Sequence, residues 1–290
     1  MPIRADLHCH SGFSDQPEER YLHRLGAREG YMEPRTLYGL ARRRGMDVIT
    51  ITDHNDIRGG REIQDLPSTV LGVELTAAFP EDRCPVHVLA YGITEPQFQE
   101  LMQLRDNLYE LLAYLQRARI AHSLAHPLAR LSPRFSLWHL ERLLLLCPCF
   151  EVLNGSRHAA SQDLMEWLLS RATAGLLSDL ADAHGLEPVG ESPWVKGRTG
   201  GSDDHSGLSV GQAWTVADGA ADATGFLDQL RRGFTRAAGA AGSSYAVTRA
   251  FYRERCAGGS ERGRLRPLVV EFLGQETTRR DIRWVRSPAA

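Results

Sequence analysis

Short apolar segments that lead into metal-binding side chains recur along this chain, and this repetition constrains the fold more than any other feature. Residues 3–7 predict a buried strand that leads directly into His8, His10 and Asp15. Because side chains repeat on one face of a strand every two residues, His8 and His10 should point in the same direction. Imidazole nitrogens beside a carboxylate form half of a site for a divalent metal. The alternative is a pair of surface histidines where a strand meets a loop.

The same arrangement recurs in further predicted strands, which alternate with helical segments. Residues 47–52 are β-branched and apolar on both faces, as in a parallel strand covered by helices. Apolar side chains at helical spacing predict helices at 95–119, 137–146 and 160–185. Polar residues gathered at strand ends are typical of an α/β barrel or an open sheet, whose sites lie there. The strands carry or end near His54, Glu74, His87, His126, Asn154, Asp203 and His205.

Six of the eleven histidines lie in or at the ends of these strands. Each one alone is explained equally well as a buried core residue, and Glu74 alone as half of a buried ion pair. Their joint position, together with Asp15, Glu74 and Asp203, favours a site for several metals. Asp6, two residues before His8, is expected either to orient an imidazole or to form an ion pair at the start of the strand.

Composition limits the class of protein. A chain of 290 residues can form one large α/β domain or two small ones. The formal net charge of −2 argues against nucleic acid as a partner, because no overall basic field is present. Five cysteines without framework spacing suit a reducing compartment. Neither a signal peptide nor a run of 18 apolar residues is visible, so we expect a cytoplasmic protein without a membrane span.

Taken in order, the motifs also match a known family. They are His8-Cys-His10 with Asp15, Thr52-Asp-His54, Gly72-Val-Glu74, His87-Val-Leu, Ala125-His126-Pro127, Asn154-Gly155 and Gly201-Ser-Asp203-Asp-His205. This set resembles the motifs of the PHP (polymerase and histidinol phosphatase) family of metal-dependent phosphoesterases, and in particular a subgroup found near or fused to glycosyltransferases. The likeness covers roughly residues 3–216. No glycosyltransferase domain fits within the chain itself.

The resemblance implies a distorted (β/α)7 TIM-like barrel with a two- or three-metal centre of Zn, Mn or Fe at the C-terminal ends of its strands. Glu74 would bridge two metals, and Glu74, Asp203 and His205 would act in catalysis. Asp15 stands where many members of the family have a histidine. The implied ligands are His8, His10, Asp15, His54, Glu74, His87, His126, Asp203 and His205.

The implied reaction is hydrolysis of a phosphate ester, of a phosphorylated small molecule or a nucleotide, by a metal-bridging hydroxide. Clustered cations favour this reaction because they lower the pKa of bound water and neutralise phosphate oxygens. Two alternatives stay open: a nuclease that acts on nucleic acid ends, and a non-catalytic metal-binding regulatory module. Salt-dependent DNA binding would identify the nuclease.

Substrate-binding residues and domain limits are predicted from position. Arg157, Arg130 and Lys196 lie on loops that we place at the rim of the site, and a guanidinium can bind phosphate through two hydrogen bonds. Asn154 is expected beside the metals. Each of the three cations is also explained as an ordinary surface charge. The polar segment 16–33 is expected to form a lid, residues 1–235 the barrel, and residues 236–290 an appendage packed on the barrel or on a partner subunit, with the oligomeric state open.

Overall fold

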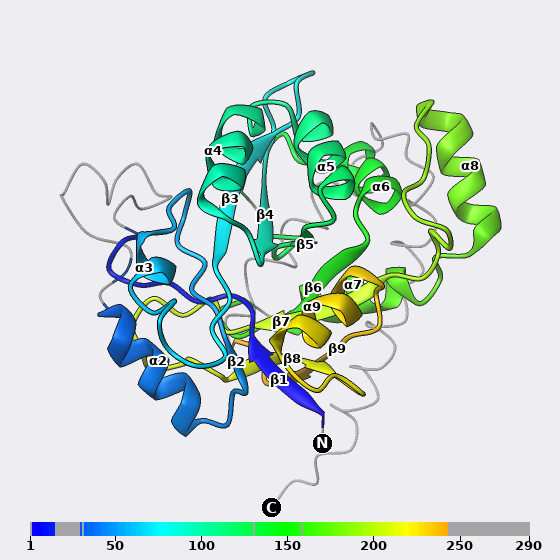
Figure 1. Ribbon diagram of the computed structural model, residues 1–290. Coiled ribbons are helices and arrows are strands. Elements are labelled where there is room, and N and C mark those ends of the chain that lie inside the picture. Colours follow the sequence, from blue (N-terminus) through cyan, green and yellow to red (C-terminus); the bar gives the residue numbers. More distant parts are fainter. Residues whose placement is uncertain (1, 15–29, 31, 130, 158, 243–290) are drawn as a thin grey trace, which may run out of the picture.

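The computed structural model describes residues 2–14, 30, 32–129, 131–157 and 159–242 (Figure 1). These residues form a mixed α/β fold of nine strands and eight helices, which confirms the α/β part of the predicted fold class. Within this part of the chain, no helix has the length and apolar character needed to cross a membrane.

Four strands form the first sheet, in the order β2-β1-β8-β9. The N-terminal strand β1 (Ile3–Asp6) pairs in parallel with β2 (Val48–Ile49) and antiparallel with β8 (Ala213–Ala217). The edge strand β9 (Arg236–Gly239) pairs antiparallel with β8. Residues 236–290 were predicted to form an appendage. The first four of them form β9 and so belong to this sheet. Residues 243–290 lie outside the described part of the chain.

Five strands form the second sheet, in the order β3-β4-β5-β6-β7. Neighbours are antiparallel from β3 to β5 and parallel from β5 to β7, so the sheet is mixed. The strand bounds are β3 (Gly72–Ala78), β4 (Pro85–Tyr91), β5 (Ala121–Leu124), β6 (Cys149–Asn154) and β7 (Gly197–Gly201).

Isolated bridges connect the two sheets beside the predicted metal ligands. His54 bridges to Glu74 and Cys9 bridges to Asp204, both in parallel. Next to them, the Gly200 N–H of β7 donates to Thr215 Oγ1 of β8 at 2.8 Å. The ladders of the described residues thus form two sheets that meet around the site, and they do not close into one continuous barrel.

Helices cover the sheets, and their ends are marked by capping residues. Thr94 and Gln97 form a capping box at the start of α4, and the Asn107 side chain accepts the Tyr109 N–H at the start of α5. The helix predicted at 95–119 is therefore two helices, because Asn107 starts a second one. The helix bounds are α2 (Pro34–Arg43), α3 (Arg58–Arg61), α4 (Glu95–Leu104), α5 (Leu108–Arg117), α6 (Leu137–Leu146), α7 (Ala159–Leu169), α8 (Ala174–His184) and α9 (Ala223–Arg231).

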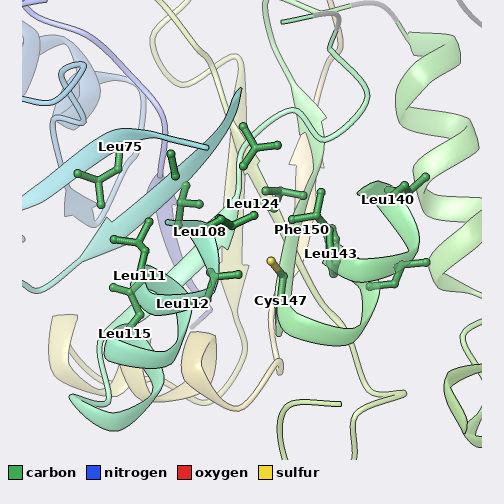
Figure 2. Packing of buried hydrophobic residues seen from close by; sticks show 14 of the residues in the cluster. Leu75, Leu108, Leu111, Leu112, Leu115, Leu124, Leu140, Leu143, Cys147 and Phe150 are labelled. Atoms are coloured by element: carbon green, nitrogen blue, oxygen red, sulfur yellow. The ribbon is translucent and has the colours of Figure 1, made fainter. Parts of the chain in front are cut away.

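The largest apolar core lies between the second sheet and helices α4 to α8. Leu108, Leu111, Leu112 and Leu115 lie on one face of α5 at helical spacing, and all are at most 2% exposed. Figure 2 shows these leucines in the same apolar cluster as Phe150 of β6. This core holds the outer faces of β3 to β6, so the opposite faces of those strands are available for polar residues.

Candidate metal centre

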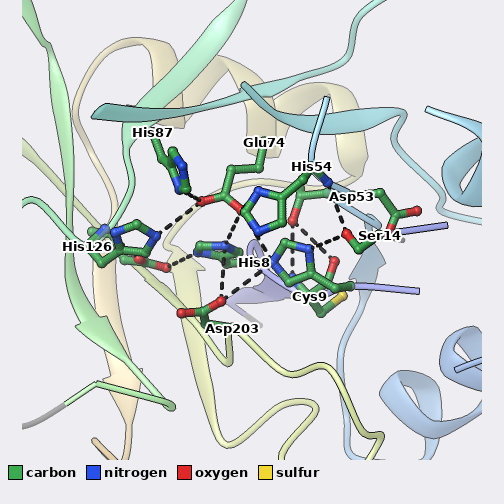
Figure 3. A network of polar contacts seen from close by, with 12 residues as sticks. His8, Cys9, Ser14, Asp53, His54, Glu74, His87, His126 and Asp203 are labelled. Carbon is green, nitrogen blue, oxygen red and sulfur yellow. Dashed lines mark hydrogen bonds and ion pairs between the residues drawn. The ribbon is translucent and has the colours of Figure 1, made fainter. Parts of the chain in front are cut away.

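Glu74 lies at the centre of a ring of histidines (Figure 3). Its side chain is fully buried in β3. Glu74 Oε2 lies 3.0 Å from His54 Nδ1, 3.1 Å from His8 Nε2 and 3.4 Å from His10 Nε2. Three histidines from two chain segments therefore meet at one carboxylate oxygen.

The other Glu74 oxygen meets two more histidines. Glu74 Oε1 lies 2.8 Å from His87 Nδ1 of β4 and 3.1 Å from His126 Nε2, which follows β5. Because β3 and β4 are antiparallel neighbours, Glu74 and His87 are brought together by the sheet itself. The two oxygens of Glu74 thus face two different sets of nitrogens, as expected for a bridging carboxylate.

Asp203 forms a second point of convergence. Its Oδ1 lies 3.4 Å from His8 Nε2 and 3.5 Å from both His10 Nε2 and His205 Nε2. Asp203 (φ 51°) and His126 (φ 25°) both have positive φ, which non-glycine residues rarely adopt. Strained backbone of this kind gathers at functional sites, where the surrounding structure holds it in place.

The charges of these groups are unbalanced without a cation. Burial raises the pKa of Glu74, but His54, His8 and His87 outweigh that effect and hold it well below its usual value. Burial and the neighbouring His205 lower the pKa of His10 to about 4. At neutral pH the cluster therefore contains the anionic Glu74 and the neutral ring of His10, and carboxylate oxygens and neutral imidazole nitrogens are the donor types that divalent transition metals bind.

His8 gives the clearest test of whether a metal fits. Its Nδ1 lies 3.0 Å from Glu151 Oε1, and since a carboxylate has no proton to donate, Nδ1 must carry the proton. In the neutral ring, the lone pair of Nε2 then faces Glu74 and Asp203. Nε2 is buried without a hydrogen-bond partner among the described residues. Burial lowers the pKa of His8, but Glu74, Glu151 and Asp203 hold it well above its usual value, so this position requires positive charge.

The longer distances between the ligand atoms, 3.4–3.5 Å, match the spacing at a metal, and the shorter ones are hydrogen-bond lengths. The nitrogen–oxygen distances above lie between 2.8 and 3.5 Å. Ligand atoms bound to one zinc ion at about 2.0–2.2 Å with tetrahedral angles lie about 3.3–3.6 Å apart. Within the described chain, the groups of three at this site that could share an ion are His10-His54-His205, His8-Glu74-His126, His8-His10-Asp203 and His54-Glu74-His87.

A hydroxyl group from the loop after His10 supports the ring of histidines. Ser14 Oγ lies 3.0 Å from His10 Nδ1 and accepts the backbone N–H of His54 at 3.0 Å. This contact leaves His10 Nε2 facing Glu74 and Asp203. The sequence carries no signal for this role, because serine is common in strand-to-loop turns.

Asp6 plays neither of the roles predicted for it. Its carboxylate accepts the backbone N–H groups of His8 at 3.2 Å, Ser202 at 2.8 Å and Gly211 at 2.7 Å. It therefore ties β1 to the segments around β7 and β8, and the carboxylate that contacts the His8 ring nitrogen Nδ1 is that of Glu151.

The predicted substrate-binding residues differ in where they lie. Arg157 is at the site: its Nε donates to Asp203 Oδ2 at 3.2 Å. Asn154 is also there, but its Nδ2 donates to Glu151 at 2.9 Å and to Asp203 at 3.1 Å, so it holds protein groups. Arg130 and the ninth predicted ligand, Asp15, lie outside the described residues, as does most of the predicted lid.

Lys196 does not lie at the metal cluster, and its prediction as a rim residue is wrong. Its Nζ donates to the Cys147 carbonyl at 2.9 Å and its residue is 3% exposed. Lys196 comes just before β7, whereas Asp203 follows that strand, so the two residues lie at opposite ends of it. A strand start was mistaken for a loop at the strand's end.

A hollow of about 260 Å³, measured to its open mouth, lies beside the cluster. His126, Asn154 and Arg157 line its polar side, and Leu128 and Met165 line its apolar side.

A further group of residues, Asp82, Cys84 and His139, lies close enough to share an ion but does not fit one. His139 Nδ1 accepts the Ser136 N–H at 3.1 Å, so in the neutral ring Nε2 carries the proton. That nitrogen lies 3.2 Å from Asp82 Oδ2. Its lone pair is thus absent from the side where a metal would bind.

Comparison with known proteins gives little beyond the geometry. No family model matches the chain. A 73-residue segment is 37% identical to an uncharacterized protein of Methanocaldococcus jannaschii, and it covers 25% of this chain and 40% of that protein.

Among solved structures, similarity is distant. PsfC from Pseudomonas syringae shares 14% identity over 87% of this chain and 96% of its own, with a TM-score of 0.48. A candidate metal-dependent phosphoesterase from Bifidobacterium adolescentis shares 18% identity over 69% of this chain and 87% of its own (TM-score 0.42). An amidohydrolase from Chromobacterium violaceum with bound sulfate shares 18% identity over 74% and 91% (TM-score 0.41). Similarity at this level does not assign a function, which rests on the side chains of the site.

Proposed function

We propose that this protein is a metal-dependent phosphoesterase that hydrolyses a phosphate ester at a centre of two or three divalent transition metals, Zn, Mn or Fe. The observation that carries the proposal is the arrangement around Glu74, where five imidazole nitrogens lie within 3.4 Å of its two oxygens. The proposed ligands are His8, His10, Asp15, His54, Glu74, His87, His126, Asp203 and His205.

The order and spacing of the motifs support assignment to the PHP family and, with it, a barrel-like arrangement of the strands. The donor set supports the choice of metals, because mixed nitrogen and oxygen ligands without a cysteine suit Zn, Mn or Fe better than Mg or Ca. Divalent metals held there would lower the pKa of a bound water toward neutrality and withdraw charge from phosphate oxygens.

The side chains of this protein supply the remaining requirements. Glu74 and Asp203 bring negative charge to the two points where nitrogens converge, and their pKa values are held well below the usual range. Arg157 brings a guanidinium to the edge of the cluster through its contact with Asp203. Because a guanidinium pairs with phosphate in a planar, two-bonded geometry, Arg157 is the proposed phosphate-binding residue.

The charge of the chain favours a small substrate over a nucleic acid. We therefore expect a phosphorylated small molecule or nucleotide. The near-neutral charge of the chain gives no support to a nucleic acid substrate.

The test is a substrate panel with protein reconstituted separately with Mn, Zn and Fe. The panel contains p-nitrophenyl phosphate, bis(p-nitrophenyl) phosphate, nucleoside monophosphates, a single-stranded oligonucleotide and, as a control, an amide. We expect phosphate ester cleavage that requires metal and is absent from the Glu74→Gln variant. Cleavage of the amide alone, of the oligonucleotide alone, or of nothing by fully loaded protein would contradict the proposal.

A further inference from the structure

Glu151 is a buried carboxylate that touches two of the proposed ligands and a neighbour of a third. It lies in β6 and is 3% exposed. Its Oε1 accepts from His8 Nδ1 at 3.0 Å, and its Oε2 accepts the backbone N–H of His126 at 2.8 Å. Oε2 also accepts from Asn154 Nδ2 at 2.9 Å, and the same Asn154 nitrogen donates to Asp203 Oδ2 at 3.1 Å. One side chain thus connects ligands that follow three different strands.

A bulge in β6 allows Glu151 and Asn154 to face the same side of the sheet. Glu151 pairs with Thr199 and Leu153 pairs with Gly200, so Val152 is an extra residue in the ladder. In a regular strand, Glu151 and a residue three positions later would point to opposite faces. The bulge changes the direction of the following side chains, so that Glu151 and Asn154 both face the metal cluster. Bulges are common beside active sites for this reason.

Glu151 packs closely against β7 on the side that faces His8. A methyl group placed on Gly201 of β7 would come within 2.9 Å of Glu151 Oε1 and within 2.7 Å of the His8 backbone nitrogen. Strands β1, β6 and β7 therefore approach one another closely at this point, and Gly201 is required for that approach.

We propose that Glu151 is a positioning residue that sets the protonation pattern of His8 and through it the affinity of the centre for metal. Its carboxylate accepts the Nδ1 proton, so the lone pair of His8 Nε2 is directed at the space between Glu74 and Asp203. Its second oxygen fixes the backbone at His126, where φ is strained, and through Asn154 the orientation of Asp203. This inference rests on the proposed metal centre, which it extends to a residue outside the ligand set.

The carboxylate is needed for a reason that an amide cannot meet. Three donors converge on Glu151: His8 Nδ1, the His126 N–H and Asn154 Nδ2. In Glu151→Gln, the single amide oxygen would accept the two donors at the Oε2 position, and the amide N–H would then face His8 Nδ1. His8 would switch to the tautomer with its proton on Nε2, which removes the lone pair that binds metal.

The experiment compares Glu151→Gln with a matched control, Glu141→Gln. Glu141 of α6 is itself buried and forms a pair with the half-buried His184 of α8, with Oε2 and Nε2 2.7 Å apart, and neither helix carries a proposed ligand. Zinc affinity of each metal-stripped protein is measured by competition with a chromophoric chelator. We expect a loss of about 10- to 100-fold for Glu151→Gln, the usual effect of removing a ligand's hydrogen-bond partner. For Glu141→Gln we expect unchanged affinity.

A second measurement reads the proton position on His8 directly. Histidine ¹⁵N chemical shifts report which ring nitrogen carries the proton, with His8→Gln identifying the His8 signals. In the zinc-loaded wild type we expect His8 to have a proton on Nδ1 and none on Nε2, and in metal-free Glu151→Gln a proton on Nε2 and none on Nδ1.

The outcomes separate this inference from the proposed function. If wild-type protein binds no zinc, the metal centre itself is wrong. If wild-type protein binds zinc but Glu151→Gln has unchanged affinity, or loses affinity no more than Glu141→Gln, Glu151 has only a structural role and the inference is overturned. A wild-type His8 without a proton on Nδ1 would also overturn it.

Discussion

Replacing Glu74 with glutamine removes the charge that the ring of histidines surrounds while nearly preserving its shape. The backbone contacts should survive, because the Asn55 N–H still donates to the carbonyl of residue 74, and the N–H of residue 74 still donates to the Asp53 carbonyl. We therefore expect a folded protein with a defective centre.

The expected loss of metal follows from the grouping of the ligands. Two of the four groups that could hold an ion contain Glu74: His8-Glu74-His126 and His54-Glu74-His87. Of the two or three metals expected in the wild type, the variant should retain at most one, held on the Asp203 side. At a free metal concentration of 100 times Kd, each lost site removes about 2.7 kcal/mol of stabilisation. Two sites then correspond to a fall of roughly 10–20 °C in the metal-induced rise of Tm.

Two assays check this expectation together. Elemental analysis gives the number of metals per chain after reconstitution, and differential scanning fluorimetry gives Tm with and without metal. Metal-free wild type and metal-free Glu74→Gln provide the baseline, so that a change in intrinsic stability is separated from a change in binding. A variant that keeps two metals and a wild-type Tm rise would refute the bridging role.

Further predictions address other parts of the structure. Burial lowers the pKa of Lys196 from 10.5 to about 8, a penalty of about 3 kcal/mol in the charged form. The charged lysine destabilises the folded protein by this full amount below pH 8, and the effect is lost as the pH rises to 10.5. In urea unfolding, Lys196→Met should therefore be more stable than wild type at pH 7, and the difference should shrink toward pH 10.5. A difference that does not depend on pH, or a change in KM, would contradict the placement of Lys196 in a buried position away from the site. Gly201→Ala should cost about 1–3 kcal/mol of unfolding free energy and lower zinc affinity, because the new methyl group lies 2.3 Å from His8 Cβ; wild-type affinity in a chelator competition would be inconsistent with the close approach. Arg157→Ala should raise KM for the best phosphate ester and lower kcat/KM by about 10- to 150-fold, the value of a charged hydrogen bond, with metal content retained; unchanged steady-state kinetics would exclude Arg157 from phosphate binding.

Much of the site could be predicted from the sequence because strand periodicity and ligand chemistry are local properties. Residues 3–7 predicted a strand that presents His8 and His10 together, and the structure brings both nitrogens to Glu74. The helix at 137–146 also has the predicted bounds, since its apolar spacing is uninterrupted. Eight of the nine predicted ligands lie in the described part of the chain, and all eight meet around Glu74 and Asp203.

The supporting residues could not be predicted, because they depend on contacts between distant segments. Glu151 lies 143 positions from His8, and its role depends on an extra residue in β6 that strand periodicity does not reveal. Lys196 was misplaced because the start of β7 was not located correctly. Strand pairing was also missed: β3, β4 and β5 are antiparallel neighbours, whereas a repeating strand and helix pattern had predicted parallel ones.

The most direct test of the metal centre is the metal content of the wild-type protein itself. Protein purified without chelators, and a second sample stripped and reconstituted with Mn, Zn or Fe, are analysed for bound metal after removal of free ions. Two or three equivalents per chain are expected, since the two oxygens of Glu74 face two different sets of histidines, and Asp203 Oδ1 meets His205 as well as His8 and His10. Less than one equivalent in the reconstituted sample would contradict the assignment of these residues as metal ligands.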